Sequence, residues 1–419
     1  MTGILSIFSF EPGWELHHFV NYGLEALSHR GGSYKLACWW QSGRVFCEGF
    51  EYMGAENLRE AGAAVAALLD REHISRQVIE LQNSVTIFDR PSSLTSEIAE
   101  AVDKAMLSSQ PHVELAKSLS LYREADAPSF TTLTSRGELV VWRSSLGLTP
   151  MTIGGYGFDL VIASSETSAI EVLDADIRRH LSPGEGVYLS RRQVRLFRSR
   201  TSNNCKLCLF ELLYTARHDS VVDGVNVYEF RKSLGIRLGK YLDSTVDVVT
   251  GVPETAIPYA IGLSQAVGIP FEPGFVGTAR RDRSMLKEGI RERLITVHLK
   301  LNPIRKVFRG KRVAIVDDSM VTGSTLKTVT QILRYRVGAK ELHVLLASPR
   351  LVSTCPYNVT KLNPDIMVSA HLSDSQIVKY LDVDSLSWLR EEDIEAVARS
   401  VNMRFCGICF GKDSLGGDQ

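Results

Sequence analysis

The chain has 419 residues, of which 44% are hydrophobic and 23% are charged, within the range of globular proteins. This length exceeds one ordinary core, so we expect two domains. The 48 Lys and Arg residues balance 48 Asp and Glu residues, which excludes an overall charge that would recruit nucleic acid or a membrane surface.

The start of the chain and its apolar stretches indicate where the protein resides. The first residues, MTGILSIFSFEPGWE, have no positive leader before the apolar run, so we expect no signal peptide. No stretch has the roughly 18 apolar residues of a membrane helix. We expect a cytoplasmic protein that has neither a membrane nor a nucleic acid as partner.

The first two hundred residues combine short alternating runs with two stretches of helical spacing. Apolar residues recur every three or four positions in ENLREAGAAVAALLDREH (56–73) and in SEIAEAVDKAML (96–107), which predicts two helices. GEGVYLSRRQVRLFRS (184–199) predicts a β-hairpin. The polar segment SRTSNNCK (199–206) is the predicted joint between a first domain, residues 1–200, and a second domain, residues 205–419.

Strands and helices alternate after this joint. Segments typical of strands are VDVVTGVP (246–253), RVAIVDD (312–318) and ELHVLLAS (341–348). Segments typical of helices are VYEFRKSLGIRLGKYL (227–242), ETAIPYAIGLSQAVG (254–268) and GSTLKTVTQILRYRVGA (323–339). This alternation predicts an α/β domain with a parallel sheet, in which ligands lie beyond the carboxyl ends of the strands.

RVAIVDDSMVTGST (312–325) lies at such a strand end and continues into a hydroxyl-rich turn before a helix. Unpaired backbone N–H groups and the dipole at a helix start favour a phosphate, and Gly323 lets the backbone approach closely. Asp317 and Asp318 could accept hydrogen bonds from sugar hydroxyls or help to hold Mg2+. We expect a phosphorylated sugar, although an N-cap after two exposed acids gives the same short pattern.

The whole pattern resembles the phosphoribosyl diphosphate (PRPP) signature of the type I phosphoribosyltransferases. It consists of four apolar residues, DD, a hydroxyl residue, two apolar residues and TGST. The resemblance implies that Asp317 and Asp318 are catalytic, steadying the ribose and Mg2+. It implies that the 5′-phosphate is held by the turn that contains Ser319, Thr322, Gly323, Ser324 and Thr325. VDVVTGVPETA (246–256) is similar to the diphosphate loop of that family, although taken alone it fits an ordinary strand–helix loop better. Its implied PRPP-binding residues are Val252, Pro253, Glu254 and Thr255.

Positive charge is concentrated near these loops. From Arg280 to Arg312 there are twelve Lys or Arg residues and three acidic residues. Such an excess suits a polyanionic substrate, and it also fits a solvated basic helix. We find no interleaved aromatic residues that would stack on nucleic-acid bases.

Longer segments indicate which phosphoribosyltransferases the chain resembles. CLFELLYTARHDSVVDGVNVYEFRKSLG (208–235), SPRLVSTCPYNV (348–359) and CGICFGK (406–412) are similar to the glutamine PRPP amidotransferases, or amidophosphoribosyltransferases, and the similarity covers residues 205–412. It implies an αββα glutaminase-type domain of the Ntn-hydrolase class followed by a type I phosphoribosyltransferase domain. The implied reaction uses PRPP and ammonia to make 5-phosphoribosylamine for de novo purine synthesis, in a homo-oligomer.

The resemblance also assigns the cysteines. Some members of the family carry a four-iron, four-sulfur cluster on four cysteines, and Cys208, Cys355, Cys406 and Cys409 match those positions. CGIC alone fits zinc, a redox pair or chance. Cys38, Cys47 and Cys205 are expected to be buried free thiols, because the cytosol keeps thiols reduced.

The N-terminal part departs from the family pattern. Thr2 stands where the family has its cysteine nucleophile, whereas YGLEALSHRG (22–31) resembles the family's helix and HRG turn. The family's RYxTxG motif and Asn-Gly dipeptide are missing, and Ser144 and Thr149 replace an aspartate and an arginine. An N-terminal threonine can act as a nucleophile. Without the arginine clamp and the oxyanion donor, however, we expect a retained fold that has lost glutaminase activity. Ammonia would then be free or come from a partner protein.

A second departure concerns the loop that covers PRPP. TARRDRSML (278–286) stands in its place, and Arg281, with Arg280 and Arg283, could clamp the diphosphate. Thr322 replaces an arginine that is usual in the family. Two functions remain open: an amidophosphoribosyltransferase-like enzyme, which we favour, and a non-catalytic paralogue that senses PRPP or nucleotides and regulates a true amidophosphoribosyltransferase.

Overall fold

The structure is a computed structural model that describes residues 2–32, 34–50, 55–123, 126–277 and 301–416. The chain divides into two compact units. The N-terminal unit comprises Met1–Glu211, Thr215–Asn226 and Pro356–Thr360, and the C-terminal unit comprises Leu212–Tyr214, Val227–Cys355 and Lys361–Gln419. Within the described ranges, no helix combines the length and the apolar character needed to cross a membrane.

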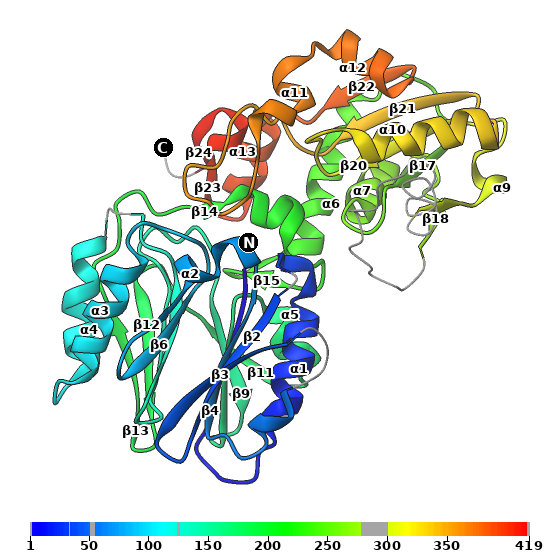
Figure 1. The fold of residues 1–419 in the computed structure, drawn as a ribbon. Coiled ribbons are helices and arrows are strands. Elements are labelled where there is room, and N and C mark those ends of the chain that lie inside the picture. Colours follow the sequence, from blue (N-terminus) through cyan, green and yellow to red (C-terminus); the bar gives the residue numbers. More distant parts are fainter. Residues whose placement is uncertain (1, 33, 51–54, 124–125, 278–300, 417–419) are drawn as a thin grey trace. The chain divides into compact units, whose positions relative to one another are not determined.

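Two antiparallel sheets form the centre of the N-terminal unit (Figure 1). The first contains, in spatial order, β11 (Asp176–His180), β9 (Thr152–Tyr156), β10 (Leu160–Ser164), β1 (Gly3–Ser9), β4 (Ala63–Leu69), β2 (Tyr34–Gln41) and β3 (Arg44–Phe50). The second contains β13 (Gln193–Arg198), β12 (Glu185–Ser190), β8 (Leu139–Trp142), β7 (Phe130–Thr134), β6 (Ser84–Phe88) and β5 (Val78–Glu80).

Helices cover the outer faces of both sheets, giving four layers in the order αββα. Helices α1 (Leu16–Ala26) and α5 (Thr167–Val172) pack on the first sheet, and α3 (Thr95–Met106) and α4 (Pro111–Leu119) pack on the second. Strand periodicity creates the separate cores, because successive side chains point to opposite faces. In β1, Ile4 and Phe8 join the core between the sheets, whereas Leu5 and Ile7 join the core beneath α1. Short elements complete this unit: α2 (Ile74–Gln77), β14 (Leu207–Cys208), β15 (Val221–Val222) and β16 (Val225–Asn226).

The structure confirms two of the predicted elements of this unit and corrects a third. Helix α3 confirms the helix expected at 96–107, and the paired strands β12 and β13 confirm the hairpin at 184–199. The helix predicted at 56–73 is wrong, because Ala63–Leu69 is strand β4. This strand is buried on both faces, so its alanine-rich run has no polar side, and the spacing of apolar residues cannot separate strand from helix.

The expectation of free thiols at Cys38 and Cys47 is also wrong. These residues lie directly opposite each other on β2 and β3, with Cα atoms 4.0 Å apart, and form a disulfide. The turn at Ser42 and Gly43 folds the two strands back on each other and so brings the two cysteines together. The prediction of free thiols considered only the reducing cytosol and not this strand pairing. Cys205 is free but only partly buried.

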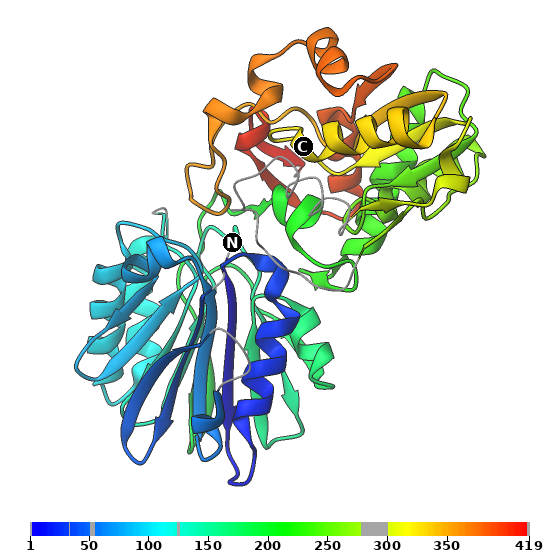
Figure 2. The ribbon, with the colours of Figure 1, turned by 45° about the vertical axis from the view of Figure 1, so that its right-hand side comes forward.

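A parallel sheet organises the C-terminal unit (Figure 2). Its strands, in spatial order, are β17 (Val248–Gly251), β20 (Arg312–Asp317), β21 (Glu341–Leu346) and β22 (Ser385–Trp388). The helices between and before them are α6 (Val227–Leu238), α7 (Ile257–Val267), α10 (Ser324–Gln331), α11 (Val368–His371) and α12 (Asp374–Leu381). A π-helical turn, Ile332–Val337, extends α10 to Gly338. The strands and helices predicted in this half are confirmed.

The remaining described elements flank this sheet. They are β18 (Phe275–Val276), β19 (Asn302–Pro303), α9 (Arg305–Phe308), α13 (Glu391–Ser400), β23 (Arg404–Gly407) and β24 (Lys412–Gly416). Side chains of α10 and α12 pack with β20 and β21 in one buried cluster. The sheet thereby holds the carboxyl ends of β17 and β20 in fixed register, Gly251 opposite Val316.

One buried arginine joins several loops of the N-terminal unit. Arg143, 1% exposed, donates to the carbonyl oxygens of Gly147 at 3.1 Å, Thr149 at 2.9 Å and Leu181 at 2.7 Å. It also donates to both carboxylate oxygens of Asp223, at 2.6 and 2.7 Å. A single side chain thus satisfies carbonyl groups that no strand pairs.

Candidate functional site

The turn after β20 has the geometry of an anion-binding helix start. Gly323 occupies the N-cap of α10 with φ at 65°, a conformation that favours glycine. A Cβ atom there would lie 3.0 Å from Met320 and 3.3 Å from Tyr380. The hydroxyls of Thr322 and Ser324 lie 2.9 Å apart, and Ser324 and Thr325 are exposed. The turn therefore presents hydroxyl groups to solvent at the positive end of a helix.

Two neighbouring carboxyl groups precede this turn. The backbone N–H of Asp318 donates to the Asp317 carboxylate at 3.0 Å, and the Ser319 hydroxyl donates to Asp318 at 2.7 Å. Burial raises the pKa of Asp318 to about 6. Burial and the neighbouring Asp318 carboxyl raise the pKa of Asp317 well above its usual range. Such a pair is stabilised by a cation or by hydroxyl donors that compensate its charge.

The second predicted loop leaves the sheet beside the first. Strands β17 and β20 are adjacent and parallel, and the N–H of Val252 donates to the carbonyl oxygen of Val316 at 2.9 Å. The loop continues through a cis peptide bond between Pro253 and Glu254, and α7 begins at Ile257. The predicted diphosphate residues, Val252, Pro253, Glu254 and Thr255, therefore lie at the same sheet edge as Asp317 and Asp318.

Two side chains of this site were missed by the sequence patterns. Lys327, on the first turn of α10, places its Nζ atom 4.1 Å from the centre of the Tyr380 ring. The Tyr380 hydroxyl donates to the carbonyl oxygen of Thr322 at 3.4 Å. A lysine four residues after the helix-start glycine was visible in the sequence, but no local signal connects it with Tyr380.

Two buried side chains, Arg231 and Tyr259, belong to the same unit as the carboxyl pair. Arg231, 1% exposed, donates to the carbonyl oxygen of Leu212 at 2.8 Å, and the Tyr259 hydroxyl donates to Leu213 at 2.9 Å. The Arg231 charge acts on Asp318 in the direction opposite to burial and lowers its pKa. Burial raises the pKa of Tyr259. Arg231 thus supplies a fixed positive charge that acts on Asp318.

The cysteines of the C-terminal unit lie on two joined segments. The N–H of Val352 donates to the carbonyl oxygen of Cys409 at 2.9 Å, and Ser353 donates to Ile408 at 2.7 Å. Cys406 and Cys409 are each 7% exposed and Cys355 is partly exposed. Burial, with the nearby Cys355 and Cys406, raises the pKa of the Cys409 thiol to about 12. Crowded, buried thiols of this kind suit a soft metal centre. Cys208, 6% exposed, belongs to the N-terminal unit.

The basic stretch is only partly described. Arg280, Arg281 and Arg283, expected to clamp the diphosphate, lie outside the described residues. Of its described members, Arg312 pairs with Asp247 at 2.7 Å and Arg305 donates to the carbonyl oxygen of Arg336 at 3.1 Å.

Comparison with known proteins assigns the chain to a family. Residues 231–367 match the family described as phosphoribosyl transferase domain. Over 336 residues the chain is 34% identical to the amidophosphoribosyltransferase of Bacillus subtilis strain 168, a match that covers 79% of this chain and 68% of that protein. This chain belongs to the amidophosphoribosyltransferase family.

Other amidophosphoribosyltransferases match shorter stretches. The protein of Synechococcus elongatus is 35% identical over 271 residues, which cover 64% of this chain and 55% of that protein. The Synechocystis protein is 34% identical over 288 residues, 68% of this chain and 58% of that protein. The matched part of the chain thus spans little more than half the length of these two relatives.

Solved structures establish the amidophosphoribosyltransferase fold. The glutamine PRPP amidotransferase from B. subtilis, complexed with ADP and GMP, superposes with a TM-score of 0.82 at 26% identity, covering 98% of this chain and 97% of that chain. A structure described as the allosteric regulatory enzyme of purine biosynthesis gives 0.81, also at 26% identity, covering 98% and 96%. The fold is an Ntn-hydrolase-like αββα domain of the glutaminase type followed by a type I phosphoribosyltransferase domain.

The surroundings of Thr2, the residue predicted to occupy the nucleophile position, are filled. Thr2 is 8% exposed, and its Oγ1 accepts a hydrogen bond of 2.7 Å from Gln77, which also donates to the carbonyl oxygen of Phe88 at 3.1 Å. The space around it has essentially no volume open to water. Its walls are formed by Thr2, Arg30, Asp89, Arg90, Thr149, Ser165 and Val359.

Of the two substituted family positions, Ser144 and Thr149, the second lines this region. Thr149 donates to the Asp89 carboxylate, and Ser144 donates to the carbonyl oxygen of Ala127 at 2.6 Å. Burial raises the pKa of Asp89. Both hydroxyls thus bond within the protein.

A buried ionic network surrounds the HRG turn. Arg30 donates to Glu166 at 2.7 Å and also pairs with Glu211, and His29 lies 2.7 Å from Glu166. Ser220 donates to Glu166 at 2.7 Å. Burial alone would raise the pKa of Glu166, but the hydrogen bond from His29 and the charge of Arg30 lower it far below its usual value. Sequence spacing gave no signal for this network, because its members come from four distant segments.

Proposed function

We propose that this chain binds Mg2+–PRPP and transfers ammonia to C1 of the ribose, releasing diphosphate and forming 5-phosphoribosylamine for purine synthesis. The observation that carries the proposal is the common sheet edge of β17 and β20. It places the Pro253 loop beside Asp317, Asp318 and the Thr322–Thr325 turn. A diphosphate and a 5′-phosphate need two such anion sites at opposite ends of one ribose.

Each part of the site has a proposed role. Asp317 and Asp318 accept hydrogen bonds from the ribose hydroxyls and help to hold Mg2+, whose charge would compensate the two buried carboxyl groups. The 5′-phosphate is bound by Ser319, Thr322, Gly323, Ser324 and Thr325. The diphosphate is bound by Val252, Pro253, Glu254 and Thr255, with Arg281 from the stretch outside the described residues.

The transition state carries positive charge on the ribose, so fixed negative groups near the ring lower the barrier. The carboxyl pair supplies such groups. Mg2+, when bound, would neutralise charge on the departing diphosphate.

The first domain, residues 1–200, acts in this proposal as a class II glutamine amidotransferase-like domain without glutaminase activity. The filled surroundings of Thr2 and its hydrogen bond from Gln77 support this role. Ammonia then enters free or from a partner protein that hydrolyses glutamine. The second domain, residues 205–419, carries the transferase.

A four-iron, four-sulfur cluster on Cys208, Cys355, Cys406 and Cys409 forms part of the proposal. Three of these thiols belong to the C-terminal unit. Cys355 and Cys406 lie close enough to Cys409 to raise the pKa of its thiol, which supports a shared centre. The cluster would act as a structural link, and anaerobic protein would contain about four irons per chain. A cytoplasmic homo-oligomer completes the proposal.

Diphosphate release tests the proposal directly. Full-length protein with Mg2+, PRPP and ammonium should release diphosphate, glutamine should not replace ammonium, and Asp317→Asn with Asp318→Asn should abolish release. Asp365→Asn, an exposed acid of the same unit, is the matched control. Saturable PRPP binding without turnover would instead favour the regulatory paralogue. A protein that does not bind PRPP would overturn both functions.

A further inference from the structure

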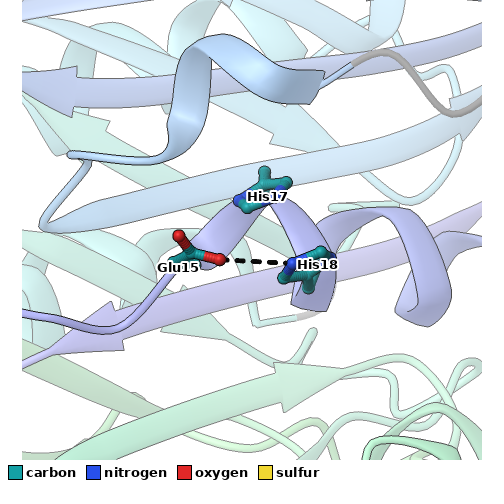
Figure 3. Close-up of side chains that lie close together, drawn as sticks. All are labelled: Glu15, His17 and His18. Atoms are coloured by element: carbon teal, nitrogen blue, oxygen red, sulfur yellow. Dashed lines mark ion pairs between the residues drawn. The ribbon is translucent and has the colours of Figure 1, made fainter.

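Three potential metal ligands gather at the start of α1, in the N-terminal unit. Figure 3 shows Glu15 just before the helix and His17 and His18 on its first turn. Each offers one ligand atom, and these atoms all lie within 4.8 Å of one another. Glu15 and His18 are already in contact, with Oε2 and Nε2 3.2 Å apart. The ring centroids of His17 and His18 are 3.8 Å apart.

Local helix geometry explains why Glu15 approaches His18. Glu15 and His18 are three residues apart, a spacing that places side chains on the same helix face. Glu15 occupies the N-cap position, but its side chain makes no capping hydrogen bond. Its carboxylate instead lies against His18 and is exposed to solvent, so an ion could join this pair.

Burial differs among the three residues in a way that suits an accessible ion. His17 is 4% exposed, so the fold fixes its ring. The side chains of His18 and Glu15 are 57% and 55% exposed, so an ion can reach the site from solvent. Both exposed side chains can rotate to shorten the ligand distances toward the spacing of about 3.4 Å that a tetrahedral site requires.

The chemistry of the donors selects the class of ion. Two imidazoles and one carboxylate match the ligand set of open zinc sites, where water fills the fourth position. Imidazole disfavours Mg2+ and Ca2+, which prefer oxygen ligands. The helix dipole opposes a cation at this end, and the Glu15 charge offsets that effect.

We infer that Glu15, His17 and His18 form a site for one divalent ion of the Zn2+ class on the helical face of the N-terminal unit. It shares no residue with the Asp317–Asp318 pair or with the cysteines. Binding would join the segment before α1 to the first turn of the helix, and so would stabilise this unit.

Co2+ and Zn2+ titrations of the full chain test this inference. Co2+ held by nitrogen and oxygen ligands gives weak visible bands, whereas thiolate ligands add strong near-ultraviolet bands, so the spectrum separates this site from the cysteines. His18→Ala and Glu15→Gln alter exposed side chains and should each weaken Zn2+ affinity by about tenfold or more. They should also remove the visible Co2+ bands. His73→Ala, a histidine elsewhere in the same unit, should leave both unchanged.

Two results would overturn the site. One is Zn2+ affinity unchanged in both His18→Ala and Glu15→Gln, and the other is a Co2+ spectrum that contains thiolate bands only. PRPP binding measured on the same variants should not change, which separates this inference from the proposed transferase.

Discussion

The ammonium group of Lys327 lies over the ring of Tyr380, 4.1 Å from its centre, and the hydroxyl of Tyr380 bonds to the backbone of Thr322. The Tyr380 side chain thus contacts both Lys327, on helix α10, and the turn before that helix. Through Tyr380, Lys327 lies near this turn, where a cation could accompany a phosphate.

Replacing Lys327 tests this relationship. Lys327→Ala should weaken PRPP binding about tenfold, since a hydrogen bond to a charged group contributes about 1.5–3 kcal/mol. Lys327→Arg should retain most of the affinity. Calorimetric titration measures both, and Lys379→Ala, an exposed lysine beside Tyr380, is the control. Equal affinity in Lys327→Ala and the wild type would remove Lys327 from the site.

The carboxyl pair makes a prediction about stability and pH. The folded-state pKa of Asp318, about 6, exceeds the usual value of about 4. Protonation therefore favours the folded state. That contribution is complete below pH about 4 and is lost as the pH rises through about 6. Asp318→Asn should raise the free energy of unfolding at pH 8 by about 1–3 kcal/mol and change it little at pH 4.

Urea unfolding at the two pH values measures this effect, and PRPP titration should show that the same variant no longer binds. In the wild type, PRPP affinity should fall as the pH drops below about 6, because the ligand needs the charged form of Asp318. A variant destabilised at pH 8 would contradict the burial argument.

The surroundings of Thr2 predict that restoring a nucleophile is insufficient. Thr2→Cys should not generate glutaminase activity, because the space around residue 2 is filled and the family's arginine and asparagine are absent. Glutamate release from glutamine measures this, with ammonium-dependent diphosphate release as the control for folding. Glutamine hydrolysis by the cysteine variant would show that the pocket opens.

The buried network of Arg30 predicts a large structural effect at Glu166. Glu166→Gln should lower the free energy of unfolding by about 3–5 kcal/mol, because the charge of Arg30 loses a buried partner. The pKa of Glu166 is lowered in the folded state, so its stabilisation is present above the unfolded value of about 4.3 and disappears only at lower pH. The difference between the variant and the wild type should therefore stay constant from pH 8 to 5. A smaller difference at pH 5 than at pH 8 would exclude this explanation.

The Cys38–Cys47 disulfide predicts a redox-dependent stability of the N-terminal unit. A bridge that closes a loop of this size contributes about 2–3 kcal/mol by restricting the unfolded chain. Reduction should lower the melting temperature of the wild type and leave Cys47→Ser unaffected. Equal melting temperatures of oxidised and reduced wild type would show that the bridge does not stabilise the fold.

Sequence patterns predicted the secondary structure correctly where the spacing of apolar residues fitted only one kind of element. Strand–helix alternation predicted β17, β20 and β21, because β17 and β20 are each followed by a helix with one buried face and β21 follows the second of these helices. They failed at β4, whose alanines are buried on both faces of the sheet. They also failed at Cys38 and Cys47, because strand pairing across a turn brings these two residues together as a disulfide. The contact of Lys327 with Tyr380 joins positions 53 residues apart, and the partners of Arg30 lie on distant segments. Only the folded chain creates such neighbours.

The hydrogen bonds of Arg143 constrain how the N-terminal unit can change. Three carbonyl oxygens and one carboxylate meet at one planar group, so any loop that moves must abandon a bond that water cannot replace in the interior. Lysine, with three donors and no fixed fork, could not serve all four. Insertions near residues 147, 181 or 223 should therefore be tolerated poorly, whereas the turn at residues 157–158 carries no such restraint from Arg143.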